Sequence, residues 1–118
     1  MRALVIIDVQ NDFTTGSLAT RHGPEVAGTI AQYIGDDLAE MNHYAHIVAT
    51  QDWHIDPGSH FSEDPDFVDS WPRHCAAGEP GSDYHPEMKR ALDYFAAVNP
   101  QVPRIDVTKG EYEAAYSG

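Results

Sequence analysis

A near-continuous run of aliphatic and β-branched residues at 3–9 (Ala-Leu-Val-Ile-Ile-Asp-Val) does most to restrict the fold of this chain. Such a run predicts a strand that is buried on both faces, as strands of parallel sheets are. From 26 to 41, apolar residues recur at three- and four-residue steps, which predicts an amphipathic helix with Pro24 in its first turn. These residues are Val26, Ile30, Tyr33, Ile34, Leu38 and Met41. A second strand at 46–50 completes a βαβ unit with parallel strands and a right-handed crossover.

The remainder of the chain adds one more helix and strand around irregular segments. Residues 10–20 are polar and are predicted to form a loop, and 51–85 shows no sustained period and contains four prolines. We predict a helix over 86–97 and a third strand over 104–108. Because no repeat or linker divides the chain, residues 1–118 are predicted to be a single α/β domain.

Charge and cysteine content argue against several classes of protein. Seven Lys and Arg against nineteen Asp and Glu give a net charge of −12, so neither nucleic acid nor an anionic membrane surface is an expected partner. The longest apolar stretch, 3–7, is too short to cross a bilayer, and no basic segment followed by an apolar one opens the chain. Together with a single cysteine, Cys75, these features predict a cytoplasmic protein.

Three ionisable residues stand at comparable places relative to the predicted strands. Asp8 lies near the end of the first, Asp52 just after the second and Lys109 just after the third. Ligands of open parallel sheets bind outside the carboxyl ends of the strands, so these side chains are expected to converge on one crevice. A surface charge is the commoner explanation for any one of them alone. It fits Asp8 least well, because an acid within an apolar run costs desolvation free energy unless it has a partner such as Lys109.

Asp52 and three histidines of the irregular segment, His54, His60 and His74, could bind a metal ion. Imidazoles combined with a carboxylate suit Zn²⁺, Mn²⁺ or Fe²⁺. Asp52 and His54 point the same way from an extended chain, and Pro57 with Gly58 can turn it back. A solvated histidine-rich loop explains the spacing equally well, although metal binding would explain how so long an irregular segment stays ordered. The other histidines are interpreted as structural or surface residues: His22, His43, His46 and His85.

Five short motifs occur in an order and spacing that resemble a known family. They are 8–13 (DVQNDF), 50–54 (TQDWH), 57–61 (PGSHF), 71–75 (WPRHC) and 109–110 (KG). As a set they closely resemble the bacterial nicotinamidase/pyrazinamidases of the isochorismatase-like cysteine hydrolases. The resemblance covers the chain apart from 86–103, which is longer than expected. It implies a three-layer α/β/α fold with a mostly parallel sheet, incomplete in this chain.

The resemblance implies hydrolysis of nicotinamide and pyrazinamide-like aromatic amides by a Cys-Lys-Asp triad. Asp8 would take the thiol proton and pass it to the leaving ammonia, and Lys109 would stabilise the thiolate. In the family the nucleophilic cysteine lies well downstream of the Lys-Gly motif, whereas this chain stops at Gly118 and Cys75 matches a non-catalytic position. The chain is therefore expected to be an inactive N-terminal part. A second chain would complete the fold, or the protein would form a homo-oligomer.

The resemblance also implies one divalent metal ion, zinc, manganese or iron, held by the acid and three histidines named above. The ion would orient the pyridine ring of an aromatic amide substrate, and Phe13, Trp71 and Tyr116 would sandwich that ring. Two alternatives stay open. One is a hydrolase in which a metal-bound water attacks and Asp8 takes no part in covalent catalysis. The other is a metal-binding fragment without turnover.

Overall fold

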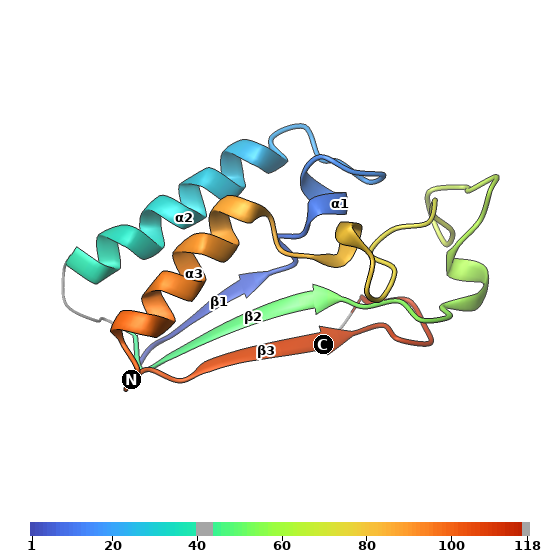
Figure 1. The fold of residues 1–118 in the computed structure, drawn as a ribbon. Coiled ribbons are helices and arrows are strands. Elements are labelled where there is room, and N and C mark those ends of the chain that lie inside the picture. Colours follow the sequence, from blue (N-terminus) through green and yellow to red (C-terminus); the bar gives the residue numbers. More distant parts are fainter. Residues whose placement is uncertain (40–43, 117–118) are drawn as a thin grey trace.

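The computed structural model describes residues 1–39 and 44–116, which fold around a three-stranded parallel sheet (Figure 1). Strands β1 (Ala3–Ile7), β2 (His46–Asp52) and β3 (Arg104–Lys109) pair in that order. The register sets Ile7 opposite Thr50 and the last residue of β2 opposite the last residue of β3. The parallel α/β architecture expected from the sequence is therefore confirmed.

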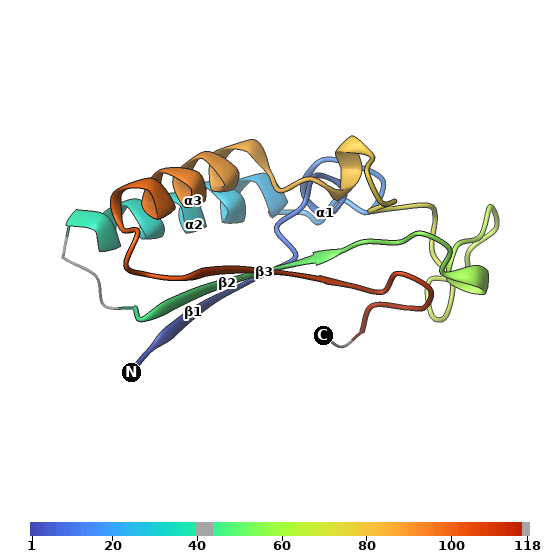
Figure 2. The ribbon, with the colours of Figure 1, turned by 60° about the horizontal axis from the view of Figure 1, so that its bottom comes forward.

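Two helices connect the strands, and both lie on the same side of the sheet (Figure 2). Helix α2 (Gly23–Ala39) follows β1, with Pro24 in its first turn. Helix α3 (Pro86–Val98) leads into β3, and the His85 side chain caps its first turn by accepting a backbone N–H bond. Both predicted helices are present, although α2 starts before the predicted stripe. Met41, which belonged to that stripe, lies outside the described residues.

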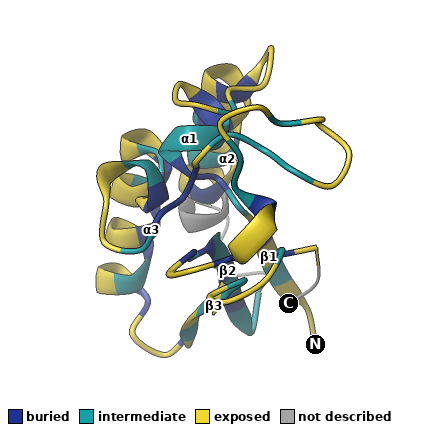
Figure 3. Ribbon diagram, turned by 90° about the vertical axis from the view of Figure 1, so that its right-hand side faces the viewer, coloured by how far each residue is buried: buried dark blue, intermediate teal, exposed yellow. Residues whose placement is uncertain are grey.

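The hydrophobic core fills the space between the sheet and these two helices, and Figure 3 colours the buried residues of both layers dark blue. It consists of Ile6, Val9, Ala27, Ile34, Ile47, Ala49, Tyr84, Met88, Leu92, Phe95 and Val102. The described residues thus supply two of the three layers expected for the fold.

The opposite face of the sheet is bare in the described part of the chain, and this corrects one expectation. Val5 is 53% exposed and Ile7 is 65% exposed, so β1 is buried on one face only. Its β-branched composition suited burial on both faces, but α2 and α3 cover the same side. Only the segment after β3, through Ala115 and Tyr116, turns back along this face, where it borders a hollow that Val5 and Ile7 also line.

Several boundaries differ from the sequence-based expectation. The predicted loop at 10–20 contains a short helix, α1 (Asn11–Thr14), and β2 continues to Asp52 because it pairs with β3 as far as Lys109. Three isolated bridges involve the long irregular segment: two within it join His54 to Ala76 and Phe61 to Trp71, and a third joins Tyr84 to Gln10. Across the described residues, none of the helices has the length and apolar composition needed to span a bilayer.

Candidate functional site

The carboxyl ends of the three strands bring one ammonium group and two carboxylates together. Lys109 Nζ donates to Asp8 Oδ2 at 3.0 Å, to Asp52 Oδ1 at 2.5 Å and to the carbonyl oxygen of Ala115 at 2.8 Å. All three donors of the ammonium group therefore have acceptors. The structure places these three residues in one cluster, which we call the lysine cluster.

The backbone at Asp8 takes an unusual conformation that directs the side chain. Its φ of 54° is left-handed, which few residues other than glycine adopt. The Asp8 N–H donates to the carbonyl oxygen of Thr50 at 3.2 Å, and Thr50 Oγ1 donates to Asp8 Oδ1 at 2.5 Å. Strained conformations of this kind are concentrated at functional sites. Thr50 and Lys109 together fix both oxygens of the Asp8 carboxylate.

The lysine cluster holds Asp52 and Lys109 in their charged forms. Burial alone would raise the pKa of Asp52, but the nearby His54 ring and the hydrogen bond and positive charge of Lys109 bring it below its ordinary value. Burial likewise opposes the charge on Lys109, yet its hydrogen bonds to Asp52 and Asp8 raise its pKa. At neutral pH this ammonium group and the Asp52 carboxylate are therefore a buried ion pair.

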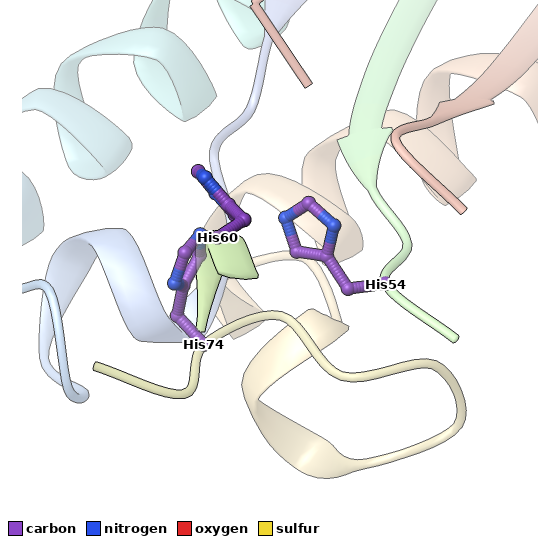
Figure 4. A group of neighbouring side chains, drawn as sticks. All are labelled: His54, His60 and His74. Atoms are coloured by element: carbon purple, nitrogen blue, oxygen red, sulfur yellow. The ribbon is translucent and has the colours of Figure 1, made fainter. Parts of the chain in front are cut away.

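Three histidines form a second group beside the lysine cluster (Figure 4). His54 follows β2, His60 ends the short turn Gly58–His60, and His74 comes from the loop beyond it. One ring nitrogen of each lies within 4.8 Å of the others, and all three side chains are buried. Asp52 lies between this histidine cluster and Lys109, with its Oδ2 3.6 Å from His54 Nε2.

Backbone carbonyls fix two of the three rings. His54 Nδ1 donates to the carbonyl oxygen of Gly110 at 2.5 Å, and His74 Nδ1 donates to that of Pro72 at 2.8 Å. Each bond leaves Nε2 as the atom with a free lone pair. Within the described residues, His54 Nε2 and His60 Nδ1 are buried without a hydrogen-bond partner. Because buried polar atoms are normally paired, neighbouring unpaired nitrogens fit a cation.

The histidine cluster also favours the neutral form that metals bind. Burial, reinforced by the neighbouring imidazoles, lowers the pKa of His60 below its ordinary value. Burial lowers the pKa of His74 as well, although its bond to Pro72 acts in the opposite direction. Imidazoles beside one carboxylate are a donor set for a borderline divalent ion such as Zn²⁺, Mn²⁺ or Fe²⁺.

Gly110 allows the chain to pass close to His54. Its φ is +71°, and a Cβ there would lie 2.4 Å from Ala115 Cβ and 2.9 Å from His54 Cε1. Both the left-handed conformation and the close approach require glycine. The Lys109–Gly110 dipeptide therefore supplies the ammonium group with one residue and the carbonyl that orients His54 with the next.

A cavity of about 330 Å³ opens between the two clusters. Its walls combine carboxylates, imidazoles and apolar side chains, contributed by Asp8, Phe13, Leu18, Asp52, His60, Trp71, His74, Ala115 and Tyr116. The three aromatic residues named from the sequence all lie here, and Trp71 Nε1 donates to the Tyr116 hydroxyl at 3.1 Å. The volume is at the lower end of the range for small-molecule sites. His54 and Lys109 are not among the cavity-lining residues, but both lie next to Asp52, which is.

Comparison with known proteins shows which proteins this chain resembles. No family model matches the chain. Over 119 aligned residues it is 49% identical to the nicotinamidase/pyrazinamidase of Mycobacterium tuberculosis, and the match covers 100% of this chain and 56% of that protein. The chain is a nicotinamidase/pyrazinamidase homologue. It spans about half the length of the curated relatives it matches.

Solved structures agree on the fold of this nicotinamidase homologue. An Acinetobacter baumanii nicotinamidase/pyrazinamidase superposes with a TM-score of 0.61 and 27% identity, over 93% of this chain and 52% of its own. A pyrazinamidase of Pyrococcus horikoshii, solved in complex with zinc, gives a TM-score of 0.59 and 23% identity, over 98% and 54%. The isochorismatase-like α/β fold expected from the sequence is thus confirmed.

The Cys75 thiol of this chain lies apart from the cavity. Cys75 is fully buried, and burial, with the nearby charges of Asp52 and Asp12, raises its pKa well above the ordinary value. Its backbone N–H donates to Asp12 Oδ2 at 2.7 Å, and its sulfur is 3.9 Å from the carbonyl oxygen of Gly81. A protonated, enclosed thiol is a poor nucleophile.

Several residues that shape the site of this chain were not identified from the sequence. Thr50 holds Asp8, and Leu18 and Ala115 line the cavity. Gln10 contacts the backbone of Asp52. The β1–β2 register could have revealed Thr50, because it brings position 50 to the end of the first strand. The others are side-chain contacts between distant segments, for which the sequence carries no periodic signal.

Proposed function

We propose that this chain carries the acid, lysine and metal-binding part of a nicotinamidase-type amidohydrolase. Such an enzyme converts nicotinamide and pyrazinamide-like aromatic amides into the carboxylic acid and ammonia. One observation carries the proposal. A single cavity is lined by Asp8, by two members of the histidine cluster, His60 and His74, and by three aromatic side chains. Its 49% identity with a nicotinamidase/pyrazinamidase supports the same activity.

A divalent ion, zinc, manganese or iron, fits the histidine cluster. Its two unpaired buried nitrogens, on His54 and His60, would be ligands together with His74 and the free oxygen of Asp52. The zinc complex of the Pyrococcus horikoshii pyrazinamidase supports this assignment. The bound ion would supply one electrophilic point of attachment for the ring nitrogen of the aromatic amide.

The cavity residues of the chain would bind and orient the substrate ring. Phe13, Trp71 and Tyr116 offer aromatic surfaces for stacking, and the hydrogen bond between Trp71 and Tyr116 fixes two of them relative to each other. Holding the ring in one orientation places the amide carbonyl near Asp8 and lowers the entropic part of the barrier.

Asp8 would serve as general base and then as general acid. In the proposed reaction, Asp8 takes the proton of a cysteine thiol, and the thiolate sulfur forms a bond with the amide carbon. The carbon–nitrogen bond then breaks, ammonia leaves with the proton from Asp8, and water hydrolyses the thioester. Lys109, bonded to Asp8 at 3.0 Å, would stabilise the negative charge throughout.

The nucleophilic thiol is the part that this chain does not offer in a suitable place. Cys75 is its single cysteine, and its thiol is buried and protonated. We propose that the nucleophile lies on protein beyond these residues, either in the same polypeptide or in a second chain, and that the 118 residues alone do not turn over amides. The same feature favours a second candidate, a metal-dependent hydrolysis that uses no cysteine.

The decisive experiment joins this chain to the part of the Mycobacterium tuberculosis relative that it does not span. Ammonia released from nicotinamide is then measured before and after treatment with iodoacetamide. We expect turnover in the chimera, its loss on alkylation, and none in the chain alone. Turnover that survives alkylation would exclude the cysteine mechanism and support the second candidate.

Two variants of the chimera test the roles of individual residues. Asp8→Ala should abolish turnover and leave the metal content unchanged, since Asp8 is outside the histidine cluster. Cys75→Ser is the matched control and should keep most of the activity. A near-normal kcat for Asp8→Ala would remove Asp8 from the mechanism. A total loss of activity in Cys75→Ser would show that Cys75 is the nucleophile after all.

A further inference from the structure

Gln10 makes an unusual set of contacts beside the site. Its side chain is fully buried, and its carboxamide forms three hydrogen bonds of 2.8 Å. Nε2 donates to the carbonyl oxygens of Asp52 and Ser82, and Oε1 accepts from the Asp52 N–H. One side chain thus satisfies both backbone polar groups of Asp52.

These contacts continue the pairing of β1 and β2 beyond the end of β1. In a parallel ladder, alternate residues of one strand offer both their N–H and their C=O to the same neighbour. The ladder ends where the Asp8 N–H donates to Thr50, because the left-handed backbone of Asp8 turns the chain away. Two residues further along β2, Asp52 meets the Gln10 carboxamide instead of a backbone amide.

The backbone of Asp52 matters because its carboxylate serves both clusters. Oδ1 accepts from Lys109 at 2.5 Å, and Oδ2 is 3.6 Å from the unpaired Nε2 of His54. On its other side, Asp52 pairs with Lys109 in the β2–β3 register. Releasing the side that Gln10 holds would let the carboxylate turn toward Lys109 and away from the histidines.

We propose that Gln10 is a positioning residue for metal binding: its carboxamide replaces the missing strand partner of Asp52 and so holds that carboxylate between Lys109 and the histidine cluster. This inference rests on the metal site proposed above. Groups that orient a metal ligand without touching the metal are worth about 10- to 100-fold in metal affinity.

The test measures zinc affinity of the 118-residue chain by competition with a chromophoric chelator. Gln10→Met keeps the length of the side chain and removes all three hydrogen bonds, so we expect zinc to bind about 10- to 100-fold more weakly. Gln51→Met is the matched control, because the Gln51 side chain also donates to Ser82, at 2.9 Å, whereas the hydrogen bonds to the Asp52 N–H and C=O come from Gln10. It should leave the affinity unchanged.

A double-mutant cycle separates positioning from a general loss of stability. If Gln10 acts through Asp52, the variant that combines Gln10→Met with Asp52→Asn binds zinc no more weakly than Asp52→Asn alone. Additive losses would overturn the proposal, as would equal affinities of Gln10→Met and the wild type. Should Gln10→Met not fold, Gln10→Glu replaces it in the cycle, since it sets an oxygen against the two carbonyls.

The same cycle distinguishes failure of this inference from failure of the proposed function. A wild-type chain that does not bind zinc overturns the metal site and the role of Gln10 with it. Zinc binding that depends on Asp52 but not on Gln10 overturns the inference alone. Hydrogen exchange of the Asp52 amide in the metal-free chain gives a further readout, and we expect it to become faster in Gln10→Met and to stay slow in Gln51→Met.

Discussion

The lysine cluster and the histidine cluster lie side by side but differ in whether their buried polar atoms have hydrogen-bond partners. In the lysine cluster, each ammonium donor of Lys109 has an acceptor, and Thr50 and Lys109 bind both oxygens of Asp8. In the histidine cluster, His54 Nε2 and His60 Nδ1 are buried and have no hydrogen-bond partner among the residues that the structure describes. The hydrogen bonds of the first arrangement are complete, and the second leaves two buried nitrogens that a cation could bind.

The difference in hydrogen bonding between the two clusters shows how one site can combine rigidity with ligand binding. A buried ion pair with all its hydrogen bonds made holds the strand ends in place. The unpaired nitrogens of His54 and His60 cost free energy as long as no cation binds them, and that cost increases the gain on binding. Asp52 belongs to the lysine cluster, and its other carboxylate oxygen lies 3.6 Å from His54 Nε2, so Asp52 is the residue that links the two clusters.

The largest effect is expected from removing the ammonium group. Lys109→Met leaves the buried Asp52 carboxylate and the half-buried Asp8 carboxylate without their cation and should lower the free energy of unfolding by about 3–5 kcal/mol. Urea denaturation at pH 7 measures this. Lys89→Met is the control, because Lys89 pairs with Asp93 on the surface and should contribute less than about 1 kcal/mol. Equal losses in the two variants would erase the contrast between a complete buried cluster and an ordinary surface pair.

Zinc should produce the next largest effect, through the histidine cluster alone. At a free concentration of 100 times Kd, it should raise the free energy of unfolding by about 2.7 kcal/mol. His54→Leu removes one unpaired nitrogen and should abolish the gain, whereas His22→Leu, at an exposed histidine paired with Glu25, should retain it. A gain that persists in His54→Leu would show that zinc binds elsewhere.

Acidification should have a smaller effect with a definite sign. His60 and His74 have lowered pKa values in the folded chain, so the unfolded chain takes up protons first as the pH falls below about 6.5. The stabilising contribution of their neutral forms is therefore complete above that pH and is lost below it. Urea midpoints of the metal-free chain at pH 7.5 and 5.5 measure the loss. A variant with His60→Gln and His74→Gln should lose less, and an unchanged difference would refute this account.

The smallest effect is expected at Cys75, which is buried near both clusters but serves neither. Its raised pKa and burial predict that iodoacetamide does not modify the folded chain at neutral pH and reacts only in urea. Cys75→Ser should leave the zinc gain intact. Rapid alkylation of the folded chain, detected by mass spectrometry, would show that the thiol is accessible after all.

Much of the fold and the meeting of the site residues could be predicted from sequence patterns. The β-branched runs and the apolar helix period define the strands and α2, and parallel strands must end at the same edge. That geometry alone brings Asp8, Asp52 and Lys109 together, as the structure shows. The expected meeting of the histidines depended on an assumed turn at Pro57 and Gly58. The structure has a turn at Gly58–His60, directly after Pro57.

What sequence patterns could not supply are features that depend on contacts between distant segments. The left-handed backbone of Asp8 is maintained by Thr50 across the sheet, and the three bonds of Gln10 reach residues more than forty positions away. The one-sided burial of β1 was missed for a related reason. Composition reports that Val5 and Ile7 tolerate burial, but the placement of the helices decides whether they are covered.

The bare side of the sheet has a consequence for how this chain behaves in solution. Val5 and Ile7 border a hollow of about 460 Å³ that Val48 and Val107 also line. Water in contact with such an aliphatic surface is unfavourable, so any self-association that covers it draws the equilibrium toward the folded chain. The melting temperature should accordingly rise with protein concentration. Dyes that fluoresce when they bind exposed hydrophobic surface should show increased fluorescence with the native protein.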